Sequence, residues 1–303
     1  MSAARGRIAR VNEVRRVTLP SGRRVAVRRL AEGGTGRTVV FCHPAPGAGT
    51  FDPDPEQTAL RDVTLLGVDR PGYGESDPLG PDEWATVDRA ADDVADLLGA
   101  VASGPVGLAG WAAGGRVALA LGARRPDLVE RIVLFGTPAP DSEVPWLPAP
   151  LRDRLDALRA EGPAAAHHGL GELFAEEAAA EPHSRRALNL LGGLELDSAS
   201  LDAVPGSRQR LADMLAHAFA QGVAGLAADV AGYCLRPWGF EPSAVSAKTL
   251  LLYGSRDPYA ANRHATWWQR RLPQARMEML PGAGPLAIVR SWKRALSYLS
   301  PMR

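Results

Sequence analysis

Short apolar runs alternate along this chain with longer segments of helical periodicity, and this alternation limits the folds open to it. The runs lie at residues 38–42, 63–68, 106–109, 131–135, 249–253 and 275–280. Runs this short and apolar are typical of parallel strands that are buried on both faces. Helical patterns separate them, at residues 84–101, 115–123, 261–271 and 286–299. We therefore expect an α/β fold with a mostly parallel, doubly wound sheet.

Two regions depart from this alternation. Residues 7–31 alternate apolar and polar side chains around the turn signal Pro20-Ser21-Gly22, which predicts a β-hairpin. Residues 138–246 open with closely spaced prolines and then show only helical patterns, for example at 151–158, 170–180, 211–219 and 224–231. We expect residues 138–246 to form an inserted helical cap over a core made of residues 1–137 and 247–303.

Composition limits the partners and the compartment that we expect. The 303 residues carry a formal net charge of +1, which indicates neither nucleic acid nor an anionic membrane as a partner. Cys42 and Cys234 make neither a disulfide framework nor a metal site. No apolar run has the length of a membrane span, and the first residues lack the apolar region of a signal peptide. We expect a cytoplasmic protein without metal or cofactor, because no cofactor fingerprint is present.

The segment from Val106 to Ala120 carries most of the functional information. A strand runs into Gly110-Trp111-Ala112-Ala113-Gly114, and this turn opens a helix. Such a strand–turn–helix unit is the setting of a nucleophile elbow, in which the central residue stands at the tip of a tight turn. The N–H group of the next residue, Ala113, would then lie at a helix N-terminus, where it stabilises negative charge on an oxygen.

On these residues the chain resembles the α/β-hydrolase family, and three further segments strengthen the resemblance because they follow in the family's order. His43-Pro44-Ala45-Pro46-Gly47 looks like the oxyanion loop, and residues 69–76 (DRPGYGES) match the D-x-x-G-x-G-x-S loop. The strand at 249–253 leads to Asp257, in the place of the triad acid. The resemblance implies a capped, esterase-like or epoxide-hydrolase-like member with an oxyanion site at Pro44, Ala112 and Ala113.

Two departures from the family pattern decide the functional expectation. Position 112 is alanine where the family has its nucleophile, and Pro285 occupies the place of the general base in Pro281-Gly282-Ala283-Gly284-Pro285. Ser–His–Asp chemistry needs a nucleophile, a base and an orienting acid, and two of the three are missing. Alanine alone would be a natural choice for an engineered substrate trap, but proline in place of histidine is not. The joint change favours a natural protein without the triad.

Asp257 and His43 are the candidate catalytic residues, and each also has a purely structural interpretation. Asp257 is either an acid or base, or a relic that caps its loop or pairs with Arg256 or Arg263. His43 either shuttles protons or closes the oxyanion loop. His264 and the four cap histidines are expected to be packing or solvated residues. A capped pocket in this fold lies between core and cap, and the predicted pocket residues are Trp111, Tyr73, Trp146, Trp238 and Pro285.

Three functions follow from these expectations. The first is a non-hydrolytic enzyme of lyase, isomerase or cyclase type, in a setting such as secondary-metabolite biosynthesis. The second is an inactive protein that binds a ligand or a partner. Hydrolysis by an unusual mechanism is the third, and it needs a base that the sequence does not offer. The expected ligand is an apolar small molecule, and a homodimer is compatible with the sequence.

Overall fold

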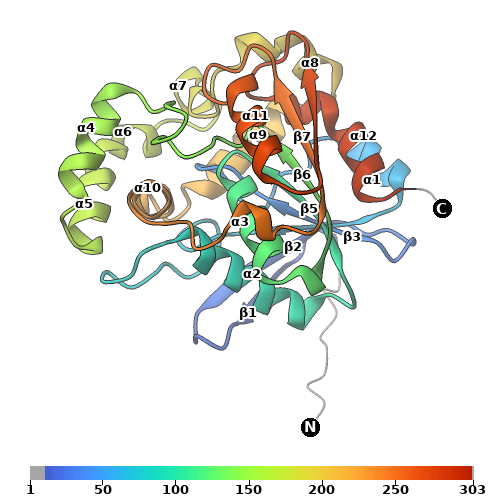
Figure 1. Ribbon diagram of the computed structural model, residues 1–303, viewed down its shortest axis with the longest axis horizontal. Coiled ribbons are helices and arrows are strands. Elements are labelled where there is room, and N and C mark those ends of the chain that lie inside the picture. The colour runs from blue at the N-terminus through green and yellow to red at the C-terminus, as the bar shows by residue number, and fades with distance from the viewer. Residues whose placement is uncertain (1–10, 302–303) are drawn as a thin grey trace.

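An eight-stranded, mostly parallel sheet forms the centre of the computed structural model, which describes residues 11–301 (Figure 1). The strand order is β1-β2-β4-β3-β5-β6-β7-β8. Strand β2 pairs antiparallel with β1 and β4, and every other neighbouring pair is parallel. The strands are β1 (Val14–Thr18), β2 (Arg24–Ala31), β3 (Thr38–Cys42), β4 (Thr64–Val68), β5 (Val106–Trp111), β6 (Val129–Phe135), β7 (Lys248–Gly254) and β8 (Ala275–Leu280).

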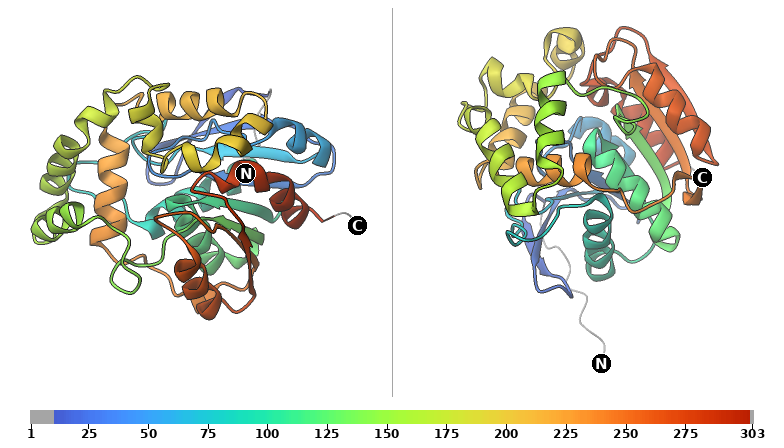
Figure 2. Two further views of the ribbon diagram at one scale, coloured as in Figure 1. Left: turned by 90° about the horizontal axis from the view of Figure 1, so that it is seen from above. Right: turned by 60° about the vertical axis from the view of Figure 1, so that its left-hand side comes forward.

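The predicted strands and hairpin are present, with ends that differ by a few residues. The hairpin consists of β1 and β2, and the predicted segment 7–10 lies outside the described residues. Strands β3 to β7 are largely buried because helices cover both faces of the sheet, whereas the edge strand β8 is only half-buried (Figure 2). One face carries α2 (Val87–Val101), α3 (Ala113–Arg124) and α11 (Asn262–Arg271), and the other carries α1 (Pro55–Arg61) and α12 (Ala287–Leu299). Helix α1 was not predicted, because seven residues are too few to show a clear period.

Only helices form between the end of β6 and the start of β7. They are α4 (Ala149–Leu158), α5 (Pro163–Leu173), α6 (Ala175–Ala178), α7 (Arg185–Asn189), α8 (Ser198–Ala203), α9 (Ser207–Ala218) and α10 (Ala224–Leu235), with the short 3-10 turns η2 (Glu195–Asp197) and η3 (Pro242–Ala244). A further 3-10 turn, η1 (Pro126–Leu128), precedes β6. The helix expected at 170–180 is two helices, because α5 ends at Leu173 and α6 begins at Ala175.

The cap has a small apolar core of its own and also packs on the sheet layer. Leu155, Leu170 and Ala231 belong to a cluster formed by α4, α5 and α10, which lie at the left in Figure 1. Leu188 and Leu211 instead belong to the cluster built on the α1 and α12 face of the sheet. Cap residues also share a cavity wall with Ala112 and Asp257, which follow β5 and β7, so the cap lies over the carboxyl edge of these strands, where ligands bind in open α/β sheets.

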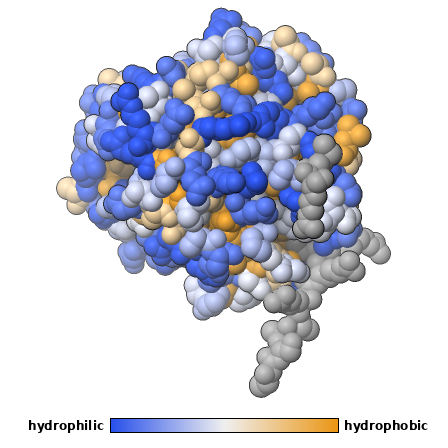
Figure 3. Space-filling model, turned by 45° about the vertical axis from the view of Figure 1, so that its right-hand side comes forward, coloured by the Kyte–Doolittle hydropathy of each residue, from blue (hydrophilic) through white to orange (hydrophobic). Residues whose placement is uncertain are grey.

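The face of the molecule in Figure 3 shows apolar side chains scattered among hydrophilic ones. Across the described residues, the large apolar side chains that are well exposed are Val11, Leu60, Leu173 and Tyr259. Among residues 11–301, no helix combines the length and the apolar composition needed to cross a bilayer.

Candidate functional site

The turn between β5 and α3 has the backbone conformation of a nucleophile elbow. Ala112 stands at its tip with φ 48° and ψ −113°, a region that residues with a Cβ rarely occupy. Its N–H donates to the Phe135 carbonyl at 2.9 Å, which ties the tip to β6. The strained turn is therefore retained although no nucleophilic atom stands at its tip.

Glycine is required on both sides of this tip because backbone segments cross closely there. A Cβ on Gly110 would lie 2.5 Å from the Gly115 Cα, and one on Gly114 would lie 2.0 Å from the Cys42 carbonyl oxygen. Neither neighbour is a side chain that can move aside. Close packing of the backbone therefore requires glycine at both ends of this turn.

Two backbone N–H groups at this site are available to a ligand oxygen. Ala113 is the first residue of α3, and its N–H has no acceptor among residues 11–301. The Ala45 N–H, in the loop after β3, is equally free within that range. Pro44, predicted as an oxyanion residue, lines the cavity but lacks an N–H, so Ala45 is the donor that sequence reasoning missed.

His43 is held in a structural role by both ring nitrogens. Its side chain is fully buried, Nδ1 lies 2.7 Å from the Pro44 carbonyl oxygen, and Nε2 accepts from the Arg70 N–H at 3.2 Å. This pattern fixes the neutral tautomer with the proton on Nδ1. Burial, together with the Arg70 charge, lowers the pKa of His43 well below its ordinary value. His43 does not line the cavity.

Arg70 joins the oxyanion loop to the cap. Its guanidinium donates to the His43 carbonyl at 2.5 Å and to the Pro44 carbonyl at 2.8 Å. It also pairs with Asp229 of α10 at 2.6 Å, with both side chains almost fully buried. Burying either charge without its partner would cost free energy, so the two side chains are held together. Arg70 therefore fixes the loop that carries Ala45 relative to the cap.

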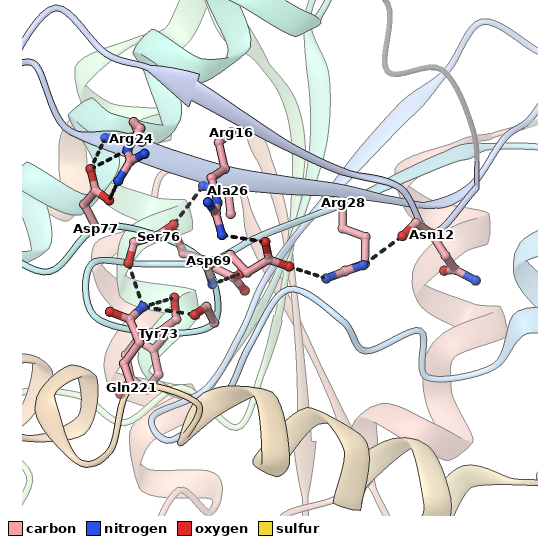
Figure 4. A network of polar contacts seen from close by, with 12 residues as sticks. Asn12, Arg16, Arg24, Ala26, Arg28, Asp69, Tyr73, Ser76, Asp77 and Gln221 are labelled. Carbon is pink, nitrogen blue, oxygen red and sulfur yellow. Dashed lines mark hydrogen bonds and ion pairs between the residues drawn. The ribbon is translucent and has the colours of Figure 1, made fainter.

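The loop 69–76 is anchored from three sides (Figure 4). The Ser76 Oγ accepts from the Ala26 N–H at 2.8 Å and donates to the Asp69 carbonyl at 2.7 Å. An Asp69 carboxylate oxygen accepts from the Gly49 N–H at 2.6 Å. From the cap, the Gln221 amide donates to the carbonyl of Ser76 at 2.8 Å. The motif is thus held in place on both sides of Arg70.

Asp257 follows β7 and lines the cavity between core and cap. Its Oδ1 accepts from the N–H groups of Tyr259 and Ala260 at 2.8 and 3.0 Å, while its Oδ2 accepts no hydrogen bond from residues 11–301. Burial raises the pKa of Asp257 above its ordinary value in spite of these two bonds. The pairings with Arg256 or Arg263 that the sequence left open are absent among these residues.

The loop at Pro285 is bound to the cap. The carboxylate of Asp197, in η2, accepts from the N–H groups of Gly284 and Leu286, both at 2.9 Å. A Cβ added to the cap residue Gly192 would lie 2.5 Å from Pro285, so the two segments touch closely. The position of the family's general base is therefore filled by a proline that packs against the cap.

A cavity of about 340 Å³ lies between these elements. Of the predicted residues, its walls include Asp257, Pro44, Trp111, Ala112, Ala113, Trp146 and Pro285. Tyr73 does not line it, because its ring is fully buried, edge-on to His43 at 5.0 Å between ring centroids. Trp238 lines a neighbouring groove of about 1140 Å³ instead. Sequence reasoning also missed two charged wall residues, Arg116 and Asp229.

The remaining histidines lie away from this chemistry. His264 is fully buried and accepts from the Ala139 N–H at 3.1 Å, which agrees with a packing role. Within the described part of the chain, no cluster of three or more His, Cys, Asp or Glu side chains is arranged to hold a metal ion.

The fold and the site together define a capped α/β architecture with a nucleophile elbow that carries alanine. The sequence profile of the alpha/beta hydrolase fold matches residues 37–290, so the chain belongs to the α/β-hydrolase fold family. It is 29% identical over 252 residues to the pimeloyl-[acyl-carrier protein] methyl ester esterase of Chromobacterium violaceum, covering 82% of this chain and 87% of that protein.

Two further comparisons extend this relationship. A segment of the polyketide synthase ThaQ of Burkholderia thailandensis is 27% identical over 271 residues, which is 88% of this chain and 12% of the synthase. The crystal structure of a hydrolase from Pseudomonas aeruginosa superposes with a TM-score of 0.67 and 22% identity, covering 97% of this chain and all of that one. At this level of identity, the structural likeness establishes the fold.

Proposed function

We propose that this protein is a non-hydrolytic enzyme that catalyses proton transfer on an apolar small molecule with a carbonyl group. The observation that carries the proposal is the Asp257 carboxylate, whose Oδ2 is free within the described residues at the wall of the cavity. Its raised pKa brings the acid and base forms closer to balance near neutral pH than those of an ordinary aspartate.

The chemistry uses the retained backbone donors. The ligand carbonyl oxygen accepts hydrogen bonds from the N–H groups of Ala113 and Ala45. Asp257 Oδ2 then takes a proton from the carbon next to the carbonyl. The electron pair of that C–H bond moves into the carbonyl, and the resulting enolate oxygen is stabilised by the two donors and by the N-terminus of α3. In a ligand with a β,γ double bond, return of the proton to the γ-carbon completes an isomerisation. In a ligand with a leaving group on the β-carbon, departure of that group with its bonding electron pair completes an elimination.

The relatives support a carbonyl compound as the ligand. One is named as an esterase of a pimeloyl methyl ester on an acyl carrier protein, and another is a polyketide synthase. Acyl-enzyme chemistry does not transfer from the esterase to this chain, because Ala112 offers no attacking atom and Pro285 accepts no proton. A biosynthetic setting for the enzyme fits both relatives.

Deuterium exchange tests the proposal directly. We expect the protein to catalyse, in D₂O, the exchange of the protons next to the carbonyl of 4-phenylbutan-2-one for deuterium. The exchange is measured by proton NMR. The D257N variant should exchange about a hundredfold more slowly, which is the usual contribution of a general base. D127N, at an exposed aspartate outside the site, is the matched control. Equal rates for wild type and D257N would refute the role of Asp257.

A ligand-binding protein without turnover is the second candidate. It is favoured by the two hydrogen bonds from Tyr259 and Ala260 to Asp257, because they give this carboxylate a structural task in its own loop. Native mass spectrometry separates the candidates: a ligand that is retained and released unchanged supports binding, whereas a ligand that is converted supports the enzyme. A panel of p-nitrophenyl esters should give only background hydrolysis in either case.

A further inference from the structure

Arg116 is a buried cation that has no carboxylate partner. It lies in the first turn of α3, and its side chain is 3% exposed. Nε donates to the Pro138 carbonyl at 3.3 Å, and no ion pair joins the guanidinium to a carboxylate among residues 11–301. The other two buried arginines of that range are both paired, Arg70 with Asp229 and Arg29 with Glu32.

An unpaired charge is unfavourable inside a protein unless something neutralises it. Burial lowers the pKa of Arg116 from its ordinary value, but a guanidinium keeps its proton throughout the physiological range. The nearest candidates for neutralisation are already occupied. Asp229 pairs with Arg70, and Asp141 accepts from Arg152 and from the backbone of Trp146.

Two indole rings hold the guanidinium in place. Its central carbon lies 4.6 Å from the ring centroid of Trp238 and 5.5 Å from that of Trp146. Cation–π contacts of this kind orient the planar group without using its N–H donors. The N–H donors on the two terminal nitrogens therefore remain available for an acceptor from outside the chain.

The position of Arg116 connects it with the elbow. It lies three residues after Ala113 on the same helix, so the two share one face and are separated by about 4.5 Å along the axis. Arg116 lines the 340 Å³ cavity and also the neighbouring groove. The residues that line both are Arg116, Trp146, Leu147, Tyr233 and Cys234.

We propose that Arg116 binds a carboxylate of the ligand, so that the substrate class is a carbonyl compound that also carries a carboxylate. This inference rests on the proposed function in that it takes the same cavity as the substrate site. The carboxylate accepts hydrogen bonds from the guanidinium fork, and the carbonyl group extends along α3 to the N–H of Ala113.

The charge count favours a carboxylate over a phosphate. One guanidinium balances one negative charge, and within residues 11–301 no salt bridge joins a cation to the Asp257 carboxylate in the same cavity. A phosphate dianion would leave excess negative charge among tryptophan, leucine and proline side chains. The planar fork also matches the two oxygens of a carboxylate.

The test compares acids with their neutral amides. Phenylacetate, 4-phenylbutanoate and 6-phenylhexanoate are each titrated against the corresponding amide, with tryptophan fluorescence and calorimetry as readouts. We expect at least one acid to bind wild type about tenfold or more tightly than its amide. R116M should lose that preference, and R116K, which keeps the charge without the fork, should retain part of it. R125M removes an exposed arginine at the other end of α3 and should bind as wild type does.

The outcomes separate this proposal from the proposed function. If no acid binds better than its amide, or if R116M keeps the preference, the carboxylate site is wrong. Should R116M fail to fold, the acid preference of wild type and its reduction in R116K decide instead. Acid binding through Arg116 in a protein that shows no deuterium exchange supports this site and refutes the catalytic role of Asp257. Exchange that depends on Asp257, without any acid preference, supports the catalytic role and refutes the carboxylate site.

Discussion

Replacement of Ala112 by glycine should stabilise the protein, although glycine usually destabilises. Ala112 has φ 48° and ψ −113°, and such strain costs on the order of 1–3 kcal/mol for a residue with a Cβ. Glycine removes this cost. Two costs oppose this gain. Glycine gives the unfolded chain more conformational freedom, which costs about 0.4–1 kcal/mol, and the loss of a half-buried methyl group costs roughly 0.5 kcal/mol. The balance is a gain of about 1 kcal/mol, or roughly 1–3 °C in Tm for a chain of this length.

The adjacent alanine provides the matched control. Ala113 is also half-buried, but it is the first residue of α3 and has helical backbone angles. A113G relieves no strain and should cost about 0.5–1 kcal/mol. Both variants are measured by scanning calorimetry and by urea unfolding. We expect Tm shifts of opposite sign at the two neighbouring positions. A decrease in Tm for A112G equal to that for A113G would show that the elbow stores no strain.

Three further changes test other parts of the structure. Burial raises the pKa of Asp52 to about 6 from 3.8, so the contribution of this group to stability is full below about pH 4 and is lost as the pH rises through 6. The free energy of unfolding of D52N should therefore rise relative to that of wild type as the pH rises, by on the order of 2–3 kcal/mol above pH 7. Urea midpoints taken from pH 4 to 8 measure this, and a difference that stays constant with pH would contradict it. D229N leaves the Arg70 charge buried without its partner and should cost about 3–5 kcal/mol, seen as a lower Tm; an unchanged Tm would contradict the link between loop and cap. D197N loses one of the two acceptors that hold the Pro285 loop and should cost about 1–3 kcal/mol, with faster amide exchange in that loop; unchanged exchange would mean that the cap does not hold it.

The elements of the fold could be predicted because their signals are local. The run at 106–109, the glycines around Ala112 and the helical pattern after it lie within one short segment, and the structure keeps them together. The cap was recognisable because strand patterns stop after Pro138. Asp257 was found in the same way, since it directly follows a buried strand.

Residues whose roles depend on distant contacts were beyond the sequence. Arg116 is a single polar position in an apolar helix, a pattern that usually marks a solvated face, and only the packing of Trp146 and Trp238 makes it a buried cation. Tyr73 was expected in the pocket because it lies in a site motif, but its loop turns the ring into the core. Asp197 binds a loop 87 residues further along the chain, and no spacing rule predicts such a contact.

The close contact between Gly192 and Pro285 bears on whether position 285 can hold a larger side chain. Alanine and serine codons differ by a single base, and so do proline and histidine codons. Serine at 112 would meet a backbone that already has the required turn, so that step is open. Histidine at 285 would meet the cap on the side of Gly192 and could extend only on the side of the cavity that Pro285 lines. Comparing ester hydrolysis by A112S P285H with that by A112S alone measures whether a histidine at 285 reaches the turn. The cap therefore limits the choice of side chain at 285, whereas the turn at 112 sets no such limit for serine.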